Sequence, residues 1–209
     1  MVLTRLKEKT QGALGTVASA VHRIGLKPDT ITVIGMSLAL LSAFAYTQWQ
    51  TNIFYILVAA ALLLLSGFCD VLDGAVARIY QQTTEFGGFL DSLLDRYADA
   101  AVYLGIIQGG LCDLSWGVIA LIGSLLVSYS RARAEAAGLK MESIGLAERP
   151  ERIIILAVAS LIAFFLKMQT FDVMSTAIIL LAVLSNLTVL QRGIYTYKKL
   201  KKLQKQLET

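Results

Sequence analysis

Four carboxylates lie close together in the stretch Asp70-Val-Leu-Asp73-Gly-Ala-Val-Ala-Arg78 and, eight residues later, in Gly87-Gly-Phe-Leu-Asp91-Ser-Leu-Leu-Asp95. Both stretches adjoin strongly apolar segments, and in helices the spacings of three and four residues put each pair on one face. Carboxylates at or inside a bilayer are costly and usually belong to an ion or substrate site. Because the four would repel one another without cations, and because carboxylate oxygens suit Mg²⁺ or Mn²⁺, the stretch predicts a divalent-metal site with room for two ions.

The composition is that of a membrane protein. Hydrophobic residues make up 56% of the 209 residues, the mean hydropathy is +0.65 and there are two prolines. These values exclude a disordered chain and disfavour a soluble globular domain. A span needs roughly 20 apolar residues, and the chain has such segments near residues 30–49, 52–77, 88–111, 114–138, 151–168 and 171–195. We therefore expect an all-α, polytopic fold with six transmembrane helices, in one membrane domain over residues 27–209 that ends in a basic tail.

Basic residues are divided unevenly between the two sides of these spans. One side has Lys167, whereas the other collects Arg5, Lys7, Lys9, Arg23, Lys27, Arg78, Arg131, Arg133, Lys140, Arg149, Arg152, Lys198, Lys199, Lys201, Lys202 and Lys205. The positive-inside rule then places both termini and the carboxylates on the cytoplasmic side of the cell (plasma) membrane. The net charge of +4 is explained by this topology and by attraction to anionic membrane lipid, and it does not indicate nucleic-acid binding.

The N-terminal residues 1–26 have an amphipathic pattern. Apolar residues recur there at roughly helical spacing, at Leu3, Leu6, Leu14, Val17, Val21 and Ile24. No uninterrupted apolar core follows the basic start, so the segment is not a signal peptide. We expect an interfacial helix that lies on the cytoplasmic leaflet.

The third predicted span carries carboxylates into the membrane. A helix over residues 88–111 is about 36 Å long, only slightly more than the apolar core of a bilayer. Asp99, one turn beyond Asp95, must therefore enter the membrane. An alternative is that these acids only sit at the interface, but aspartate is too short to reach far toward water, and the spans contain no matching set of basic residues.

The complete pattern resembles the signature of the CDP-alcohol phosphotransferase family. It is Asp70-x2-Asp73-Gly74-x2-Ala77-Arg78-x8-Gly87-x3-Asp91-x3-Asp95, and eight fixed residues at fixed spacing make a chance match improbable. The resemblance covers the whole chain and implies six helices, a cytoplasmic active site at membrane level and a homodimer. Members of this family transfer a substituted phosphate from a CDP-linked donor to an alcohol and release CMP.

The resemblance also implies roles for the motif residues. Asp70, Asp73 and Asp91 would hold divalent metal, with Asp73 bridging two Mg²⁺ ions (or Mn²⁺), and Asp95 would complete the metal site and act as the general base. The CDP-lipid would be bound by Asp29, Thr32, Asp73, Gly74, Ala77, Arg78 and Thr84. These roles suit the chemistry, because the pyrophosphate must be neutralised before attack and the alcohol must lose its proton.

The acceptor is indicated by arginines near the ends of the last three spans. The segments Ser128–Glu135 and Glu148–Arg152 and the pair Gln191-Arg192 resemble the branch of the family that uses inositol phosphate. Arginine binds phosphate through forked donors, so an acceptor-phosphate pocket is expected from Arg131, Arg133, Arg149, Arg152 and Arg192. The expected reaction is transfer of a lipid phosphate from CDP-archaeol or CDP-diacylglycerol to inositol 1-phosphate.

Other interpretations remain open at this point. One alternative is that the arginines only enforce topology. Another is glycerol 3-phosphate as the acceptor, because it carries the same phosphate as inositol phosphate; serine is a weaker candidate acceptor. A magnesium transporter would also use intramembrane carboxylates, although its acids should be spread over both faces. The residue types do not distinguish ether from ester donor lipids.

Two further expectations concern packing and the cysteines. The Gly105-x3-Gly109 spacing fits tight packing within the chain or a dimer contact. Cys69 and Cys112 are expected to be unpaired.

Overall fold

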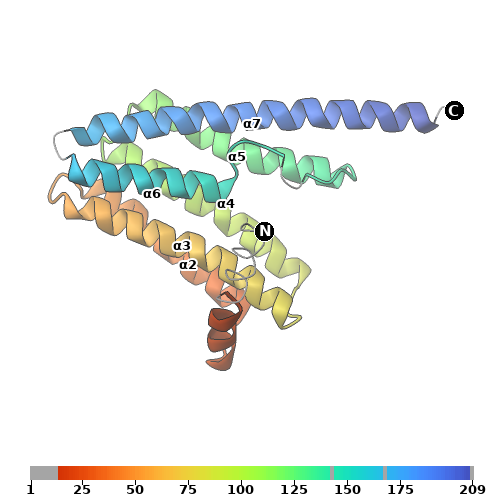
Figure 1. Ribbon diagram of the computed structural model, residues 1–209, viewed down its shortest axis with the longest axis horizontal. Helices are drawn as coiled ribbons and strands as arrows, with labels where there is room; N and C mark the ends of the chain where they lie inside the picture. The colour runs from red at the N-terminus through yellow and green to blue at the C-terminus, as the bar shows by residue number, and fades with distance from the viewer. Residues whose placement is uncertain (1–13, 142–143, 167–168, 208–209) are drawn as a thin grey trace, which may run out of the picture.

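The computed structural model describes residues 14–141, 144–166 and 169–207, and within these ranges the chain is helical and contains no β-strand. Six long helices follow one another: α2 (Pro28–Thr47), α3 (Phe54–Ile79), α4 (Glu85–Gln108), α5 (Leu114–Ala136), α6 (Arg149–Phe165) and α7 (Thr170–Leu207). The α7 helix extends well beyond the other helices (Figure 1). The expected all-α fold is confirmed.

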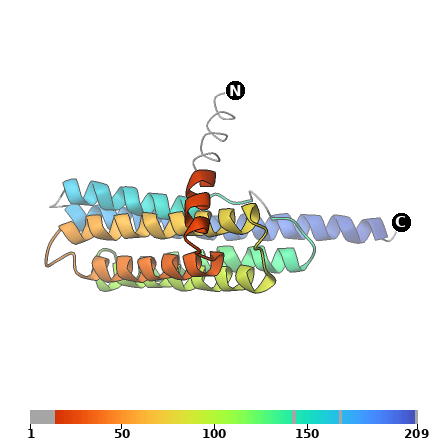
Figure 2. The same ribbon diagram turned by 90° about the horizontal axis from the view of Figure 1, so that it is seen from below.

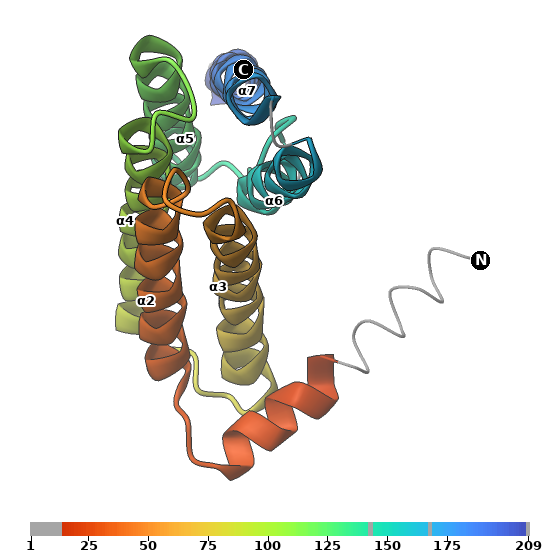
Figure 3. The ribbon, with the colours of Figure 1, turned by 90° about the vertical axis from the view of Figure 1, so that its left-hand side faces the viewer.

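The six long helices pack as a closed ring. The α2 helix packs against α3 and α4, α3 against α6, α6 against α7, α7 against α5, and α5 against α4; the view along the bundle shows this arrangement (Figure 3). Fully buried side chains such as Tyr46, Ile56, Ile106 and Leu181 form the core inside the ring. Neighbours in the ring are therefore not always neighbours in sequence.

Two of the helix starts that border the site carry recognisable signals. Pro28 stands in the first turn of α2, where its missing N–H costs nothing. The Thr84 side chain caps α4 by accepting a hydrogen bond of 2.9 Å from the backbone N–H of Gly87. The proline and the threonine cap fix where α2 and α4 begin, and with them the position of the residues in their first turns.

The α2 and α4 helices run in the same direction and touch through glycines. A Cβ atom on Gly105 would lie 2.4 Å from the carbonyl oxygen of Ala43, and one on Gly109 would lie 2.4 Å from that of Tyr46. Near the other end of the pair, a Cβ atom on Gly87 would lie 3.0 Å from Asp29 Oδ1. The Gly105-x3-Gly109 pair thus packs α4 against α2 within the chain, which was one of the two alternatives.

The outer surface of the bundle is apolar. Large side chains such as Phe44 and Phe165 are 62% and 77% exposed. Among the described residues, four helices are long and apolar enough to cross a membrane, namely α2, α3, α5 and residues Thr170–Gln204 of α7. The α6 helix has 17 residues, and α4 contains two of the motif carboxylates, Asp91 and Asp95. These features identify a membrane protein.

The segment before α2 forms a separate helix over residues 14–23, which runs across the direction of the bundle (Figure 2). Leu14 and Val21 from this helix pack against a buried cluster that includes Leu72 and Val76 of α3. The His22 ring stacks on Tyr80 with 3.7 Å between centroids. The predicted interfacial helix over residues 1–26 is thus helical in its second half, and residues 1–13 lie outside the described ranges.

The two cysteines are free, as the sequence predicts. Cys112 lies in the connection between α4 and α5, where burial and then the neighbouring Asp113 raise the pKa of its thiol to about 11. A thiol with a raised pKa is a poor nucleophile. Cys112 therefore packs as a small apolar residue.

Candidate functional site

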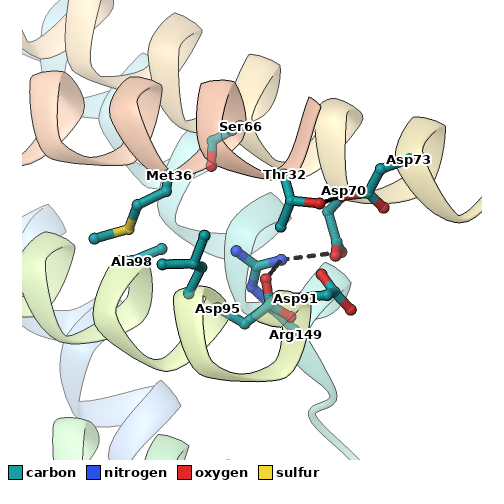
Figure 4. Close-up of a pocket in the computed structure, with 11 residues that line it drawn as sticks. Thr32, Met36, Ser66, Asp70, Asp73, Asp91, Asp95, Ala98 and Arg149 are labelled. Atoms are coloured by element: carbon teal, nitrogen blue, oxygen red, sulfur yellow. Dashed lines mark hydrogen bonds and ion pairs between the residues drawn. The ribbon is translucent and has the colours of Figure 1, made fainter. Parts of the chain in front are cut away.

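Three of the four motif carboxylates converge where α3 and α4 face each other. Asp70 comes from α3, and Asp91 and Asp95 come from α4. Each offers one oxygen, and these oxygens all lie within 4.8 Å of one another (Figure 4). The short connection between the two antiparallel helices makes this meeting possible, because it brings the end of α3 beside the start of α4.

The fourth carboxylate, Asp73, lies beside this cluster and faces α2. It is 5% exposed, and its Oδ2 accepts a hydrogen bond of 2.6 Å from Thr32 Oγ1. Asp73 lines the narrow central cavity together with Asp70, Asp91 and Asp95. It also lines the cavity on the other side of Thr32, so it stands at the boundary between the two.

Arg149, at the start of α6, pairs with the carboxylate cluster. Its Nη1 lies 2.9 Å from Asp70 Oδ2 and 2.7 Å from Asp95 Oδ1, and its Nε lies 3.4 Å from Asp99 Oδ1. Figure 4 shows the guanidinium between the acidic side chains. Arg96 Nη1 also lies 3.9 Å from Asp95 Oδ2. Two arginines only partly neutralise the four motif carboxylates, so the cluster retains an excess of negative charge.

On one side of the cluster lies a cavity of about 240 Å³, here called the Arg78 cavity. Its lining is Pro28, Asp29, Thr32, Asp73, Gly74, Ala77, Arg78, Gln82, Thr83, Thr84, Gly87, Gly88 and Asp91. All seven residues predicted to bind the CDP-lipid are in this set. The first turn of α2, the end of α3 and the start of α4 therefore build one compartment.

Two glycines keep this compartment open. A Cβ atom on Gly74 would lie 3.1 Å from Arg78 Nη1, and one on Gly87 would lie 2.9 Å from Thr84 Oγ1. Side chains at these positions would press on the Arg78 guanidinium and on the α4 cap. Glycine at both leaves backbone exposed where a ligand can approach closely.

On the other side of the cluster lies a cavity of about 280 Å³, here called the Arg149 cavity. It is lined by Asp70, Asp95, Arg96, Asp99, Val127, Ser128, Arg131, Glu148, Arg149, Pro150, Arg152 and Arg192. Five arginines in such a space favour an anionic ligand. Asp70 and Asp95 thus face this cavity, whereas Asp73 and Asp91 face the Arg78 cavity.

Asp99 lines the Arg149 cavity and binds side chains from two other helices. Its Oδ2 accepts hydrogen bonds from Arg152 Nη2 at 2.6 Å and from Ser124 Oγ at 2.7 Å. Arg152 is 3% exposed, and buried charges are stable only when they are paired in this way. Asp99 therefore lies inside the helix bundle with a partner from α6, and its entry into the membrane stays a prediction.

The donor set of the cluster suits a divalent cation. The three converging groups are carboxylates, which are the hard oxygen ligands that Mg²⁺ and Mn²⁺ prefer. Asp91 Oδ1 is buried and has no hydrogen-bond partner among the described residues. A buried oxygen without a partner is costly, and a cation at this position would satisfy it.

The sequence matches one known protein family over most of its length. The model of the CDP-alcohol phosphatidyltransferase family matches residues 26–191. The chain belongs to this family. It is therefore a transferase, and the CDP-alcohol phosphatidyltransferase match covers α2 through most of α7.

Relatives of this CDP-alcohol phosphatidyltransferase agree with one another. It is 45% identical to the archaetidylinositol phosphate synthase of Methanothermobacter thermautotrophicus, over 86% of this chain and 87% of the relative. It also resembles crystal structures of phosphatidylinositol phosphate synthase from Mycobacterium tuberculosis at 30% identity. For the structure with CDP-DAG bound, the TM-score is 0.74, and the aligned region covers 93% of that chain and 88% of this one. The complex with manganese and citrate has a TM-score of 0.75, with 88% of both chains covered.

The five arginines predicted to bind the acceptor differ in their surroundings in this family member. Arg131 and Arg149 present guanidinium groups to the Arg149 cavity. Arg192 also lines it, but donates to the carbonyl oxygens of Ile144 and Val127 and to Glu148 at 2.6–2.8 Å, which suits a role in shaping the cavity. Arg152 is held by Asp99. Arg133 is exposed and is not among the residues that line the cavity.

Several residues that line the CDP-alcohol phosphatidyltransferase site were not predicted. Gln82 and Thr83 line the Arg78 cavity, and Glu148 pairs with Arg192. The spacing of Asp99, one turn beyond Asp95, indicated that it belongs with the motif carboxylates. Its partner Arg152 is 53 residues away in the sequence, and no spacing indicated that pair. Such pairs depend on how the ring closes, which local spacing does not reveal.

Proposed function

We propose that the protein transfers the lipid-phosphate group of CDP-archaeol or CDP-diacylglycerol to inositol 1-phosphate and releases CMP. The observation that carries this proposal is the position of the carboxylate cluster between two different cavities. One cavity holds the residues of the family motif and the other holds arginines. The names of the relatives, which are synthases of archaetidylinositol phosphate and phosphatidylinositol phosphate, support the same acceptor.

The chemistry follows from this arrangement. The cytidine diphosphate occupies the Arg78 cavity, with its pyrophosphate toward Asp73 and Asp91. Inositol phosphate enters the Arg149 cavity, so its hydroxyl faces Asp95. Asp95 takes the hydroxyl proton as the oxygen attacks the lipid-bearing phosphorus, and the bond from this phosphorus to the CMP oxygen breaks. Metal held by Asp70, Asp73, Asp91 and Asp95 supplies neutralisation of the pyrophosphate charge when bound.

The metal and membrane assignments belong to the same proposal. We assign the resident metal as Mg²⁺, with two ions, and Mn²⁺ as a functional substitute. All six long helices cross the cell membrane, including α4 and α6, whose outer ends are apolar. The termini and both cavities face the cytoplasm, the segment of residues 1–26 lies on the inner leaflet, and residues 27–209 form the catalytic domain. The homodimer implied by the resemblance stays a prediction.

The direct test is an assay of CMP release by the full-length protein in detergent or lipid nanodiscs. We expect Mg²⁺-dependent release when CDP-archaeol or CDP-diacylglycerol is combined with inositol 1-phosphate, and little release with unphosphorylated inositol. Glycerol 3-phosphate is the second acceptor to be compared. Equal rates with inositol and inositol phosphate, or a clear preference for glycerol 3-phosphate, would refute the proposed acceptor.

Arg131 offers a test of the acceptor cavity that leaves the core intact. It lines the cavity, is 42% exposed and pairs with Glu135 on its own helix. A hydrogen bond to a charged group contributes about 1.5–3 kcal/mol, so Arg131→Gln should raise the KM for inositol phosphate roughly tenfold or more. The KM for the CDP-lipid should not change. Arg133→Gln is the matched control, because it removes the same charge two residues away and outside the cavity; an equal effect of both variants would contradict the assignment.

A further inference from the structure

One arginine belongs to both halves of the site. Arg149 lines the central cavity and also the Arg149 cavity. Its Nη1 contacts Asp70 and Asp95 at 2.9 and 2.7 Å, and the side chain is 15% exposed. Figure 4 shows this guanidinium reaching between the carboxylates from α6. No other basic side chain of the described residues pairs with two members of the cluster.

The guanidinium and a metal ion require the same oxygen atoms. Asp70 and Asp95 are two of the three residues whose oxygens converge for a cation. An arginine does not lose its charge in proteins, so it competes with a divalent cation throughout the accessible pH range. A cation that binds to these oxygens must displace Nη1 or bind against its repulsion.

A second nitrogen of the same guanidinium is held by another carboxylate. Arg149 Nε lies 3.4 Å from Asp99 Oδ1, and Asp99 is itself held by Arg152 and Ser124. Loss of the contacts to Asp70 and Asp95 therefore leaves Arg149 attached to the wall of the Arg149 cavity. In that cavity its freed donors are available to an anion.

We propose that Arg149 couples the binding of metal to the binding of the acceptor phosphate. It is the counter-ion of Asp70 and Asp95 before the metal arrives, and it becomes a ligand of the acceptor phosphate afterwards. The proposal rests on the proposed function, since it takes the phosphorylated acceptor to occupy the Arg149 cavity. By linkage, the metal must tighten acceptor binding by the same factor by which the acceptor tightens metal binding.

The coupling is measurable without turnover. Electron paramagnetic resonance reports free Mn²⁺, and the full-length protein is titrated with Mn²⁺ in the presence of saturating inositol 1-phosphate or of unphosphorylated inositol, with no CDP-lipid. A protein-free titration corrects for Mn²⁺ bound by the phosphate itself. We expect inositol 1-phosphate, and not inositol, to tighten Mn²⁺ binding by about 5-fold or more, the usual lower range of coupling between sites. An Mn²⁺ affinity that is independent of inositol 1-phosphate would overturn the proposal whatever the variants show.

Arg149→Gln separates this coupling from a direct contact between metal and phosphate. Without the competing charge, the variant should bind Mn²⁺ roughly 10-fold more tightly than the native protein in the absence of acceptor, and its coupling should fall below about twofold. Arg149→Lys keeps the charge and should bind Mn²⁺ more weakly than Arg149→Gln. Unchanged or weaker Mn²⁺ binding by Arg149→Gln, or coupling that persists in it, would show that Arg149 is not the link.

The control is Arg133→Gln, which removes the same charge from an exposed residue that does not line the Arg149 cavity. It should keep the native Mn²⁺ affinity and the native coupling within about twofold. The result is separable from that of the CMP assay. Absence of coupling in a protein that releases CMP refutes the role of Arg149 alone, whereas absence of CMP release refutes the proposed function.

Discussion

Asp91→Ala is expected to abolish CMP release. Asp91 lies between the central cavity and the Arg78 cavity, and its Oδ1 is buried without a hydrogen-bond partner among the described residues. Its loss removes a metal ligand and leaves two of the three converging carboxylates, Asp70 and Asp95, to hold the ion. Because metal contributes several kcal/mol to such a reaction, the rate should fall by roughly 10³-fold or more.

The measurement is CMP release at saturating CDP-lipid and acceptor, with Mn²⁺ binding followed separately. Asp172→Ala is the control: Asp172 is an exposed carboxylate in the first turn of α7, remote in sequence from the motif. It should keep close to the native rate. Near-native activity of Asp91→Ala would exclude a metal site built on this cluster.

Asp95→Asn is expected to separate binding from catalysis. Asp95 borders the central cavity and the Arg149 cavity, which is the position required of a base that meets the acceptor hydroxyl. Asparagine keeps the size and one oxygen but cannot take the proton. The loss in kcat should be about 10²–10⁴-fold, the usual contribution of general base catalysis.

Donor binding should survive this substitution in the presence of Mg²⁺. The variant is therefore tested twice, by binding of CDP-lipid and by the rate of CMP release when both substrates are saturating. A variant that loses donor binding while keeping its rate at saturation would identify Asp95 as a binding residue only.

Much of the fold was predictable because long apolar segments leave few choices. The predicted spans over residues 30–49, 52–77 and 114–138 differ from α2, α3 and α5 by two residues or fewer at each end. The largest difference is at the C-terminus, where the predicted span ends at residue 195 and α7 continues to Leu207. Hydropathy falls at the lysines there, but lysine and leucine are both good helix formers, so the helix outlasts the apolar segment.

The two halves of the site were not equally predictable. The residues of the Arg78 cavity come largely from consecutive turns of α3 and α4, and fixed spacing within helices carries that information. The Arg149 cavity is assembled from α3, α4, α5, α6 and α7. Whether Arg131 or Arg133 faces it depends on the rotation of α5 against α7, and the partner of Arg192 depends on where the connection before α6 lies. Neither is encoded in local periodicity.

The backbone contact between α2 and α4 has a mechanical consequence. At Gly105 and Gly109 the backbones of the two helices are in contact, so no side chain separates them there, and near the other end Gly87 lies against the Asp29 side chain. We therefore expect α2 and α4 to move as one rigid unit, which keeps Asp29, Thr32, Asp91 and Asp95 in fixed positions relative to one another. Any motion that widens the site to admit a lipid or release a product must be taken up on the opposite side of the ring. Sliding of α6 against α3, or of α5 against α4, would allow this widening without separating those four side chains.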